Sequence, residues 1–265
     1  MKPLRVVTVG TGTACISLTR GGACLLLEAE GYTVAVDLGL GALRGLLKAG
    51  IRHQELDCLL LTHLHVDHVA EVPSLLFAAN YDETPRTGPL ALVGGEGFEG
   101  YLEGLKLLHG RMVEPKNYAL TTSTLKPGEQ LDLGPFSVTA GAVSHDPSSL
   151  AYRFGWRGRS VAVTGDTGPL ESLEPFCSGV DLLVTEASLA EGGEYQRHLT
   201  ASQAGRLAQK AGVGSLLLTH LYPASEADRP LQRAAENFCG PVSLAHDGME
   251  ISLRPLESSP QGSGI

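Results

Sequence analysis

Short runs of hydrophobic residues alternate with short polar segments along the chain, which predicts many strands joined by brief connections. The apolar runs are bounded by Gly, Pro, Asn or Asp, a pattern typical of buried strands. They cover residues 4–9, 23–28, 33–36, 57–62, 89–93, 130–133, 136–143, 150–154, 160–164, 180–185, 214–219 and 249–253. Short turns between consecutive runs predict hairpins at 23–36, 130–143 and 150–164.

Longer segments with apolar residues at helical spacing predict helices between these strands. They cover residues 41–49, 69–79, 98–109, 200–211 and 230–238. Gly50 follows the first as a C-cap, and Thr200 is an N-cap for the segment 201–211. Strands dominate the start of each half of the chain, with helices later. This order favours an α/β protein with two mixed sheets face to face and helices outside them.

Composition agrees with a globular protein that buries a large core. The 265 residues are 43% hydrophobic and 18% charged, and Gly and Pro are scattered between the apolar runs. We expect one domain over residues 1–256 and a disordered tail over 257–265, which is rich in Ser, Gly and Pro. No signal-peptide segment or membrane span is visible, so a cytoplasmic protein without a membrane partner is the expectation.

The cysteines and the net charge narrow the classes of protein and of binding partner that the sequence allows. Five cysteines without C-x-x-C spacing argue against a disulfide framework and a thiolate zinc site, although Cys15 could approach a site. A net charge of −9 repels a long polyanion such as RNA unless a local basic patch overrides it. Arg153, Arg157 and Arg159 form one tight basic cluster, either a solvated hairpin tip or a phosphate clamp.

The most informative segment carries four potential metal ligands within six residues. It reads His63-Leu64-His65-Val66-Asp67-His68 and follows directly on the predicted strand 57–62. Packing alone rarely places three imidazoles beside a carboxylate, because each polar group then needs a partner or water. A divalent metal site gives all four a partner. Open α/β sheets place their sites just past the carboxyl ends of strands, as here.

Other predicted strands end in residues of the same type. Leu216 to Leu221 repeats the sequence of Leu59 to Leu64 letter for letter and delivers His220. Further apolar runs lead to Ser144-His145, Gly165-Asp166 and Thr185-Glu186. Imidazole and carboxylate ligands suit zinc, or manganese where oxygen donors matter more. We therefore expect several strands to deliver ligands to one edge.

These motifs, in this order, resemble the metal-ligand motifs of the metallo-β-lactamase superfamily. The resemblance is closest to its ribonuclease Z, arylsulfatase-like and phosphodiesterase branch. It is carried by the His63 to His68 array, His145, Asp166 and His220 and supported by Gly10-Thr11-Gly12, Asp37-Leu38-Gly39, His198-Leu199-Thr200-Ala201 and Ala245-His246-Asp247-Gly248. The resemblance implies an αββα sandwich that binds two zinc ions, or manganese, at one edge.

The resemblance also implies a role for each ligand. One metal would be held by His63, His65 and His145, the other by Asp67, His68 and His220, with Asp166 bridging them. With two metals, a bridging water ionises near neutral pH and can attack a phosphodiester, so a hydrolase is expected.

The catalytic set would be Asp67, His198 and Glu186. His198 corresponds in the resembling group to the general acid or to the group that stabilises the oxyanion of the scissile phosphate, and Glu186 could orient its ring. Asp37 is expected to anchor the metal loop by hydrogen bonds rather than to bind metal.

The substrate is harder to assign from the sequence. Ribonuclease Z proteins usually carry a long tRNA-binding arm between the positions of His145 and Asp166, and here that interval has room for one hairpin. The short interval and the acidic balance favour a small phosphodiester, with tRNA 3′ processing or aryl sulfate hydrolysis as alternatives. An iron-dependent oxygenase of the same fold is a further alternative, and a homodimer is possible.

Overall fold

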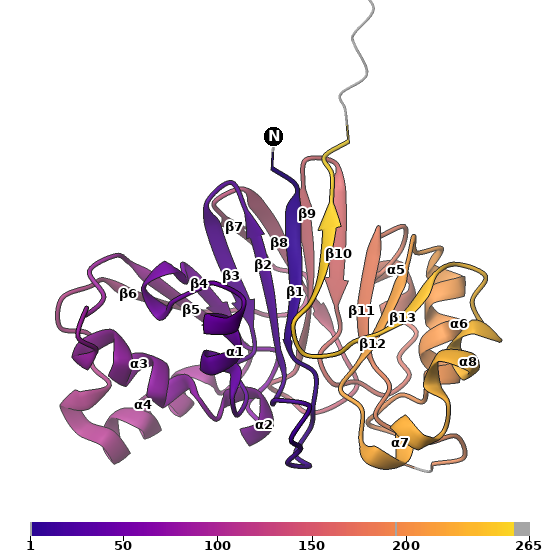
Figure 1. The fold of residues 1–265 in the computed structure, drawn as a ribbon, viewed down its shortest axis with the longest axis horizontal. Coiled ribbons are helices and arrows are strands. Elements are labelled where there is room, and N and C mark those ends of the chain that lie inside the picture. Colours follow the sequence, from indigo (N-terminus) through magenta and orange to yellow (C-terminus); the bar gives the residue numbers. More distant parts are fainter. Residues whose placement is uncertain (1, 194, 257–265) are drawn as a thin grey trace, which may run out of the picture.

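The computed structural model describes residues 2–193 and 195–256, which form two seven-stranded sheets packed face to face. Helices cover the outer face of each sheet, as Figure 1 shows with α1, α3 and α4 on one side and α6 and α8 on the other. The predicted αββα sandwich is therefore confirmed. The expected tail, residues 257–265, lies outside the described residues.

The first sheet is built from the N-terminal half of the chain and one late strand. Its spatial order is β14 (Met249–Leu253), β1 (Leu4–Gly10), β2 (Cys24–Ala29), β3 (Tyr32–Val36), β4 (Cys58–Leu60), β5 (Leu90–Gly94) and β6 (Leu120–Thr124). The strands from β14 to β3 pair antiparallel, and those from β3 to β6 pair parallel. The parallel part brings the carboxyl ends of β3, β4 and β5 to the same edge.

The second sheet repeats this plan in the C-terminal half. Its spatial order is β13 (Val242–Leu244), β12 (Leu216–Thr219), β11 (Leu182–Glu186), β10 (Arg159–Val163), β9 (Leu150–Trp156), β8 (Phe136–Ala142) and β7 (Gln130–Leu133). The strands from β7 to β10 pair antiparallel, and those from β10 to β13 pair parallel. The carboxyl ends of β10, β11 and β12 therefore share an edge, as their counterparts in the first sheet do.

The helices lie mostly in the crossovers between parallel strands. They are α1 (Ala42–Lys48), α2 (Val66–Val69), α3 (Val72–Tyr81), α4 (Phe98–His109), α5 (Leu173–Phe176), α6 (Ala201–Ala211), α7 (Pro223–Ala227) and α8 (Pro230–Ala235), with single 3₁₀ turns at His53–Glu55 and Gly110–Met112. Thr200 caps α6 as expected: its side chain accepts from the backbone N–H of Gln203, whose own side chain bonds back to Thr200. The described residues include no helix long and apolar enough to cross a membrane.

Three apolar layers hold the sandwich together. The central one lies between the sheets and is lined by alternate residues of both, including Leu27, Leu60, Phe154 and Leu217. One outer layer packs the first sheet against α1, α3 and α4, and the other packs the second sheet against α5, α6 and α8. Burial on both faces explains why the parallel strands β4, β11 and β12 read as continuous apolar runs.

Several elements differ from those expected. The predicted helix 69–79 begins later, as α3 at Val72, with Pro73 in its first turn where no backbone N–H is needed, and the short helix α2 that ends at Val69 was not predicted. The predicted helix 230–238 ends at Ala235. The sequence pattern missed the edge strands β6 and β13: β6 is polar and largely exposed, and β13 has three residues.

The hairpin of β9 and β10 occupies most of the short interval between His145 and Asp166. Arg157 and Gly158 form its turn, both with positive φ, as a two-residue hairpin turn requires. The basic cluster on this hairpin makes internal contacts: Arg153 donates to two backbone carbonyls, Arg157 pairs with Glu30, and Arg159 pairs with Asp181. These contacts favour a structural role over a phosphate clamp.

Candidate metal centre

The site lies where the carboxyl ends of strands from both sheets meet. From the first sheet, β4 leads into His63 and the short helix α2, which carries Asp67 and His68. From the second sheet, His145 follows β8, Asp166 follows β10, and His220 follows β12. Every ligand predicted from the sequence therefore reaches one edge of the sandwich.

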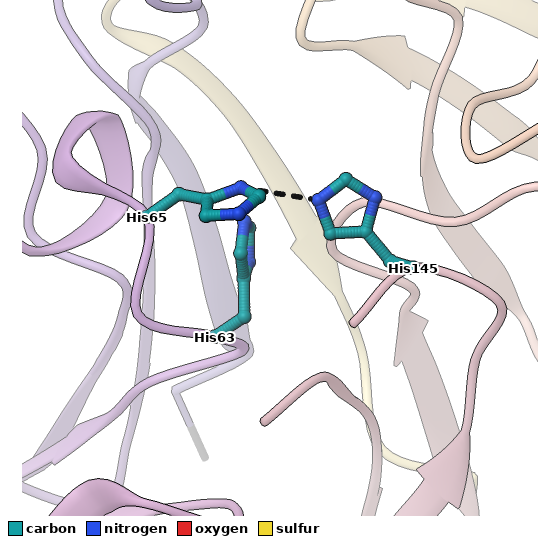
Figure 2. A group of neighbouring side chains, drawn as sticks. All are labelled: His63, His65 and His145. Atoms are coloured by element: carbon teal, nitrogen blue, oxygen red, sulfur yellow. Dashed lines mark hydrogen bonds between the residues drawn. The ribbon is translucent and has the colours of Figure 1, made fainter. Parts of the chain in front are cut away.

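The first cluster consists of His63, His65 and His145. Figure 2 shows His63 and His65 from one half of the molecule facing His145 from the other. Nδ1 of His65 lies 3.1 Å from Nε2 of His145, and one ring nitrogen from each of the three lies within 4.8 Å of the others. Such converging nitrogens from three separate imidazoles suit a metal ion.

The second cluster consists of Asp67, His68 and His220. Nε2 of His68 lies 3.2 Å from Nε2 of His220, and Asp67 Oδ2 lies 3.4 Å from the same His220 nitrogen. His68 and His220 are buried, whereas Asp67 is partly exposed at the rim. Together with the first cluster, this places two potential metal positions side by side.

Asp166 lies between the two clusters. Its Oδ2 is 3.9 Å from Nε2 of both His63 and His145, and its Oδ1 is 3.5 Å from Nε2 of His68. Burial by itself raises the pKa of Asp166, but the surrounding imidazoles, led by His220 and His68, outweigh it and hold that pKa well below its usual range. The carboxylate is therefore ionised and positioned to serve both clusters.

Two buried atoms support a fit between these residues and metal ions. Nε2 of His63 and Oδ1 of Asp166 have no hydrogen-bond partner although both are inaccessible to water. Burial also lowers the pKa of His63, which keeps its imidazole neutral, the form that ligates metals. The orphaned atoms, the neutral ring and the all-nitrogen-and-oxygen donor set fit a divalent ion such as zinc.

Outer contacts fix the orientation of the ligand rings. His68 donates from Nδ1 to Asp37 at 2.8 Å, and His145 donates from Nδ1 to the carbonyl of Arg197 at 3.0 Å. These bonds leave Nε2 of each ring free as the ligand atom. Asp37 also accepts from the backbone N–H and the hydroxyl of Thr62, both at 2.7 Å. It thus anchors the loop that carries the array, as the sequence indicated.

We predict that Asp37→Asn lowers metal affinity about 10- to 100-fold, the usual effect of losing an outer partner of a ligand. Asn tolerates the positive φ of residue 37, so the backbone can stay as it is. Competition with a chelator measures the affinity, and Asp132→Asn on the exposed strand β7 is the matched control. An affinity equal to that of the control would show that Asp37 acts only on loop structure.

His198 lies beside the two clusters, and one of its ring nitrogens is within 4.8 Å of ligand atoms of His145 and Asp166. Its Nδ1 donates to Oε1 of Glu186 at 2.8 Å and lies 3.8 Å from Asp166. Glu186 is only 1% exposed and also accepts from the backbone N–H of Thr167 at 2.6 Å. Burial lowers the pKa of His198, but the bond and charge of Glu186 outweigh it, so the net pKa is raised. The arrangement therefore favours the protonated form of the imidazole at the rim.

Some contacts of the site had no sequence signal. Asp146 lies 3.2 Å from Nε2 of His65, and Ser188 contacts Nδ1 of His220 at 3.0 Å. The position of Asp146 directly after the predicted ligand His145 is the one feature of the sequence that points to it. Arg20 donates to the Thr11 hydroxyl and the Ala245 carbonyl and pairs with Glu226, so its guanidinium is held by contacts within the protein.

The remaining histidines and Cys15 lie in different settings. His53 pairs with Asp82 at 2.8 Å, and His246 is exposed. Cys15 is exposed and lines a groove of about 1820 Å³ that Asp67 also lines. Cys15 therefore faces the approach to the centre and none of the ligand clusters found among the described residues includes it.

The fold and the double cluster define a metal-dependent hydrolase of the metallo-β-lactamase architecture. A family model described as a beta-lactamase superfamily domain matches residues 32–221, well over half of the chain, and the protein belongs to that superfamily. The matched range includes every predicted metal ligand from His63 to His220.

Relatives place the chain near the ribonuclease Z branch. A ribonuclease Z of Mycolicibacterium gilvum is 29% identical over 281 aligned positions, which cover 95% of this chain and 97% of the relative. Among solved structures, the metallo-beta-lactamase fold protein YhfI from Bacillus subtilis is 25% identical with a TM-score of 0.83, covering 94% of this chain and 99% of that one. The short form of human tRNase Z is 25% identical with a TM-score of 0.75 and the same coverage. The resemblance seen in the motifs is thereby confirmed.

Proposed function

We propose that this protein is a dinuclear, zinc-dependent phosphodiesterase that cleaves an RNA phosphodiester. The observation that carries the chemistry is one buried carboxylate, Asp166, within 4 Å of imidazoles from both ligand clusters, with the His198–Glu186 pair directly beside it. Manganese is the alternative metal, because the set includes carboxylate oxygens.

The similarity to ribonuclease Z proteins favours RNA over a small phosphodiester as substrate, whereas the sequence alone favours the small phosphodiester. The sequence favours a small phosphodiester because the interval from His145 to Asp166 is short and the chain is acidic. The relatives named ribonuclease Z support RNA more strongly, since the alignment spans nearly their whole length. The small diester stays a second candidate on the one observation of the short hairpin between β9 and β10.

The ligands divide as the clusters do. His63, His65 and His145 would hold one zinc, and Asp67, His68 and His220 the other, with Asp166 shared. Bound zinc would supply Lewis acidity for a phosphoryl oxygen and lower the pKa of water at the site.

The remaining chemistry belongs to side chains of the protein. Because Nδ1 of His198 donates to Glu186, its other nitrogen, Nε2, is the one that can give a proton to the leaving oxygen. Glu186 orients the ring through this bond and raises its pKa, which favours the protonated form. Asp67, partly exposed at the rim, faces the groove through which a substrate can enter. His63, His68, His145, Asp166 and His220 are buried, which excludes bulk water from the inner side of the site, whereas His65 is exposed.

A turnover screen tests the proposal. Protein loaded with zinc or manganese is offered bis-p-nitrophenyl phosphate, precursor tRNA, cyclic nucleotides and an aryl sulfate, and its metal content is measured. We expect hydrolysis of the aryl diester, cleavage of the precursor near its 3′ end, and about two metal ions per chain. Turnover of cyclic nucleotides but not of precursor tRNA would select the small diester. A single bound iron without diester hydrolysis would overturn the proposal.

A further inference from the structure

An exposed tyrosine stands next to the proposed general acid. Tyr195 is 56% exposed, and its ring centroid lies 5.5 Å from that of His198, with the two planes inclined by 32°. The separation falls within the range of about 4.5 to 7 Å in which aromatic rings interact, and the small inclination is close to a stacked arrangement. Because more than half of the side chain is open to water, the ring can take a second planar partner.

The other exposed aromatic side chains of the described residues already have partners. Phe77 and Tyr81 stack on one another at 4.7 Å, and Lys116 lies 3.7 Å from the Tyr81 ring centroid. For Tyr195, His198 is the one aromatic neighbour found among the described residues. A single exposed aromatic residue is ordinary on a protein surface. Its place beside a catalytic imidazole distinguishes this one.

The backbone that follows Tyr195 is tied to the metal centre. The carbonyl of Arg197 accepts from Nδ1 of His145 at 3.0 Å. The carbonyl of Gln196 packs so closely on Gly168 that a Cβ at that glycine would lie 1.8 Å from its oxygen. The chain after Tyr195 is therefore held by a ligand residue and by the loop after Asp166, which places the aromatic ring beside the reaction site.

We infer that Tyr195 and His198 form a stacking subsite for the nucleobase of the leaving nucleotide, next to the scissile phosphate. The inference rests on the proposed function, because it requires a nucleotide diester as substrate. His198 is placed to protonate the leaving oxygen, so a ring beside it meets the group that departs. Stacking tolerates any base, because every base presents a π face. The subsite would thus bind RNA without selecting its sequence.

Equilibrium binding to the zinc-loaded protein tests the subsite without turnover. Isothermal calorimetry compares adenosine 5′-monophosphate and adenosine 3′-monophosphate, one for each ribose oxygen that can depart, with ribose 5-phosphate, which carries a phosphate and no base. We expect the wild type to prefer the nucleotide about 5- to 150-fold, the usual range for one stacked base. Tyr195→Phe should keep this preference and Tyr195→Ala should abolish it. Tyr81→Ala, an exposed tyrosine with its own partners, should leave it unchanged.

The outcomes separate this inference from the proposed function. If Tyr195→Ala keeps the full preference, or if the wild type has none, the subsite is wrong even when diesters are hydrolysed. If Tyr195→Ala weakens both ligands equally, Tyr195 positions His198 instead of stacking on a base, and the inference is again refuted. A 5′-phosphorylated oligoribonucleotide that binds no tighter than the mononucleotide would refute an RNA source for the base. Absence of diester hydrolysis with an intact preference would contradict the proposed function alone.

Discussion

His198→Ala is expected to lower kcat for diester hydrolysis about 10²- to 10⁴-fold while the bound metal stays unchanged, because general acid catalysis contributes that much. The ring lies outside the two proposed ligand triads, and its Nδ1 is occupied by Glu186. Initial rates with an unactivated dinucleotide and metal analysis of the same samples measure both effects. For a substrate with a p-nitrophenolate leaving group, kcat should fall less, since that group departs without a proton.

The pH dependence provides an independent check of the same role. The pKa of His198 is raised because Glu186 outweighs the effect of burial, so the acid form persists above the usual histidine pKa. The rate should fall as the pH rises through this raised pKa and the proton is lost. Glu186→Gln removes the charge that raises the pKa, so the same fall should occur at lower pH. His109→Ala, at the end of α4, is the control histidine and should change neither rate nor profile. A profile unmoved by Glu186→Gln would contradict the pairing.

Asp166→Asn is expected to lower the metal content and to reduce turnover by more than about 100-fold, beyond the loss of an outer-shell partner. The carboxylate lies within 4 Å of imidazoles from both clusters. An amide presents one oxygen and no charge, so it cannot serve two cations equally. Metal analysis after dialysis should give about one ion per chain or fewer, where about two are expected for the wild type.

The control for this variant must separate metal loss from misfolding. Asparagine keeps the volume of aspartate, so the thermal unfolding midpoint of the metal-free variant should resemble that of the metal-free wild type. Asp132→Asn on the exposed strand β7 makes the same chemical change away from the centre and should retain metal and activity. Full metal content in Asp166→Asn would show that the two clusters do not depend on a shared carboxylate.

Much of the fold could be predicted because its strands are buried on both faces. β4, β11 and β12 read as apolar runs that end in Thr or His, and each was placed correctly in the sequence to within two or three residues. The pattern failed at the sheet edges. β6 exposes nearly all of its side chains, so its strand structure depends on pairing with β5 and leaves no hydrophobic signature.

That the candidate ligands gather at one place could be predicted for a related reason, since these residue types need partners that ordinary packing does not supply. The contacts around these ligands could not be predicted, because a single polar residue can satisfy its hydrogen bonds with water or with many different partners. Asp146 reaches His65, and Tyr195 reaches His198, only through the course of loops. In the same way, the basic cluster on the β9–β10 hairpin pairs with Glu30, in the turn after β2, and with Asp181, directly before β11, and neither contact is visible in the sequence.

The sequence by itself determined which residues can bind metal, which strands carry them and that the molecule is an α/β sandwich. These features follow from local periodicity and residue chemistry, which a linear chain displays. Only the tertiary structure decided that His65 meets His145 across 80 positions, that His68 meets His220 across 152, and that Asp166 lies between both pairs. Such contacts depend on how two sheets pack, and packing joins segments whose separation along the chain leaves no local pattern.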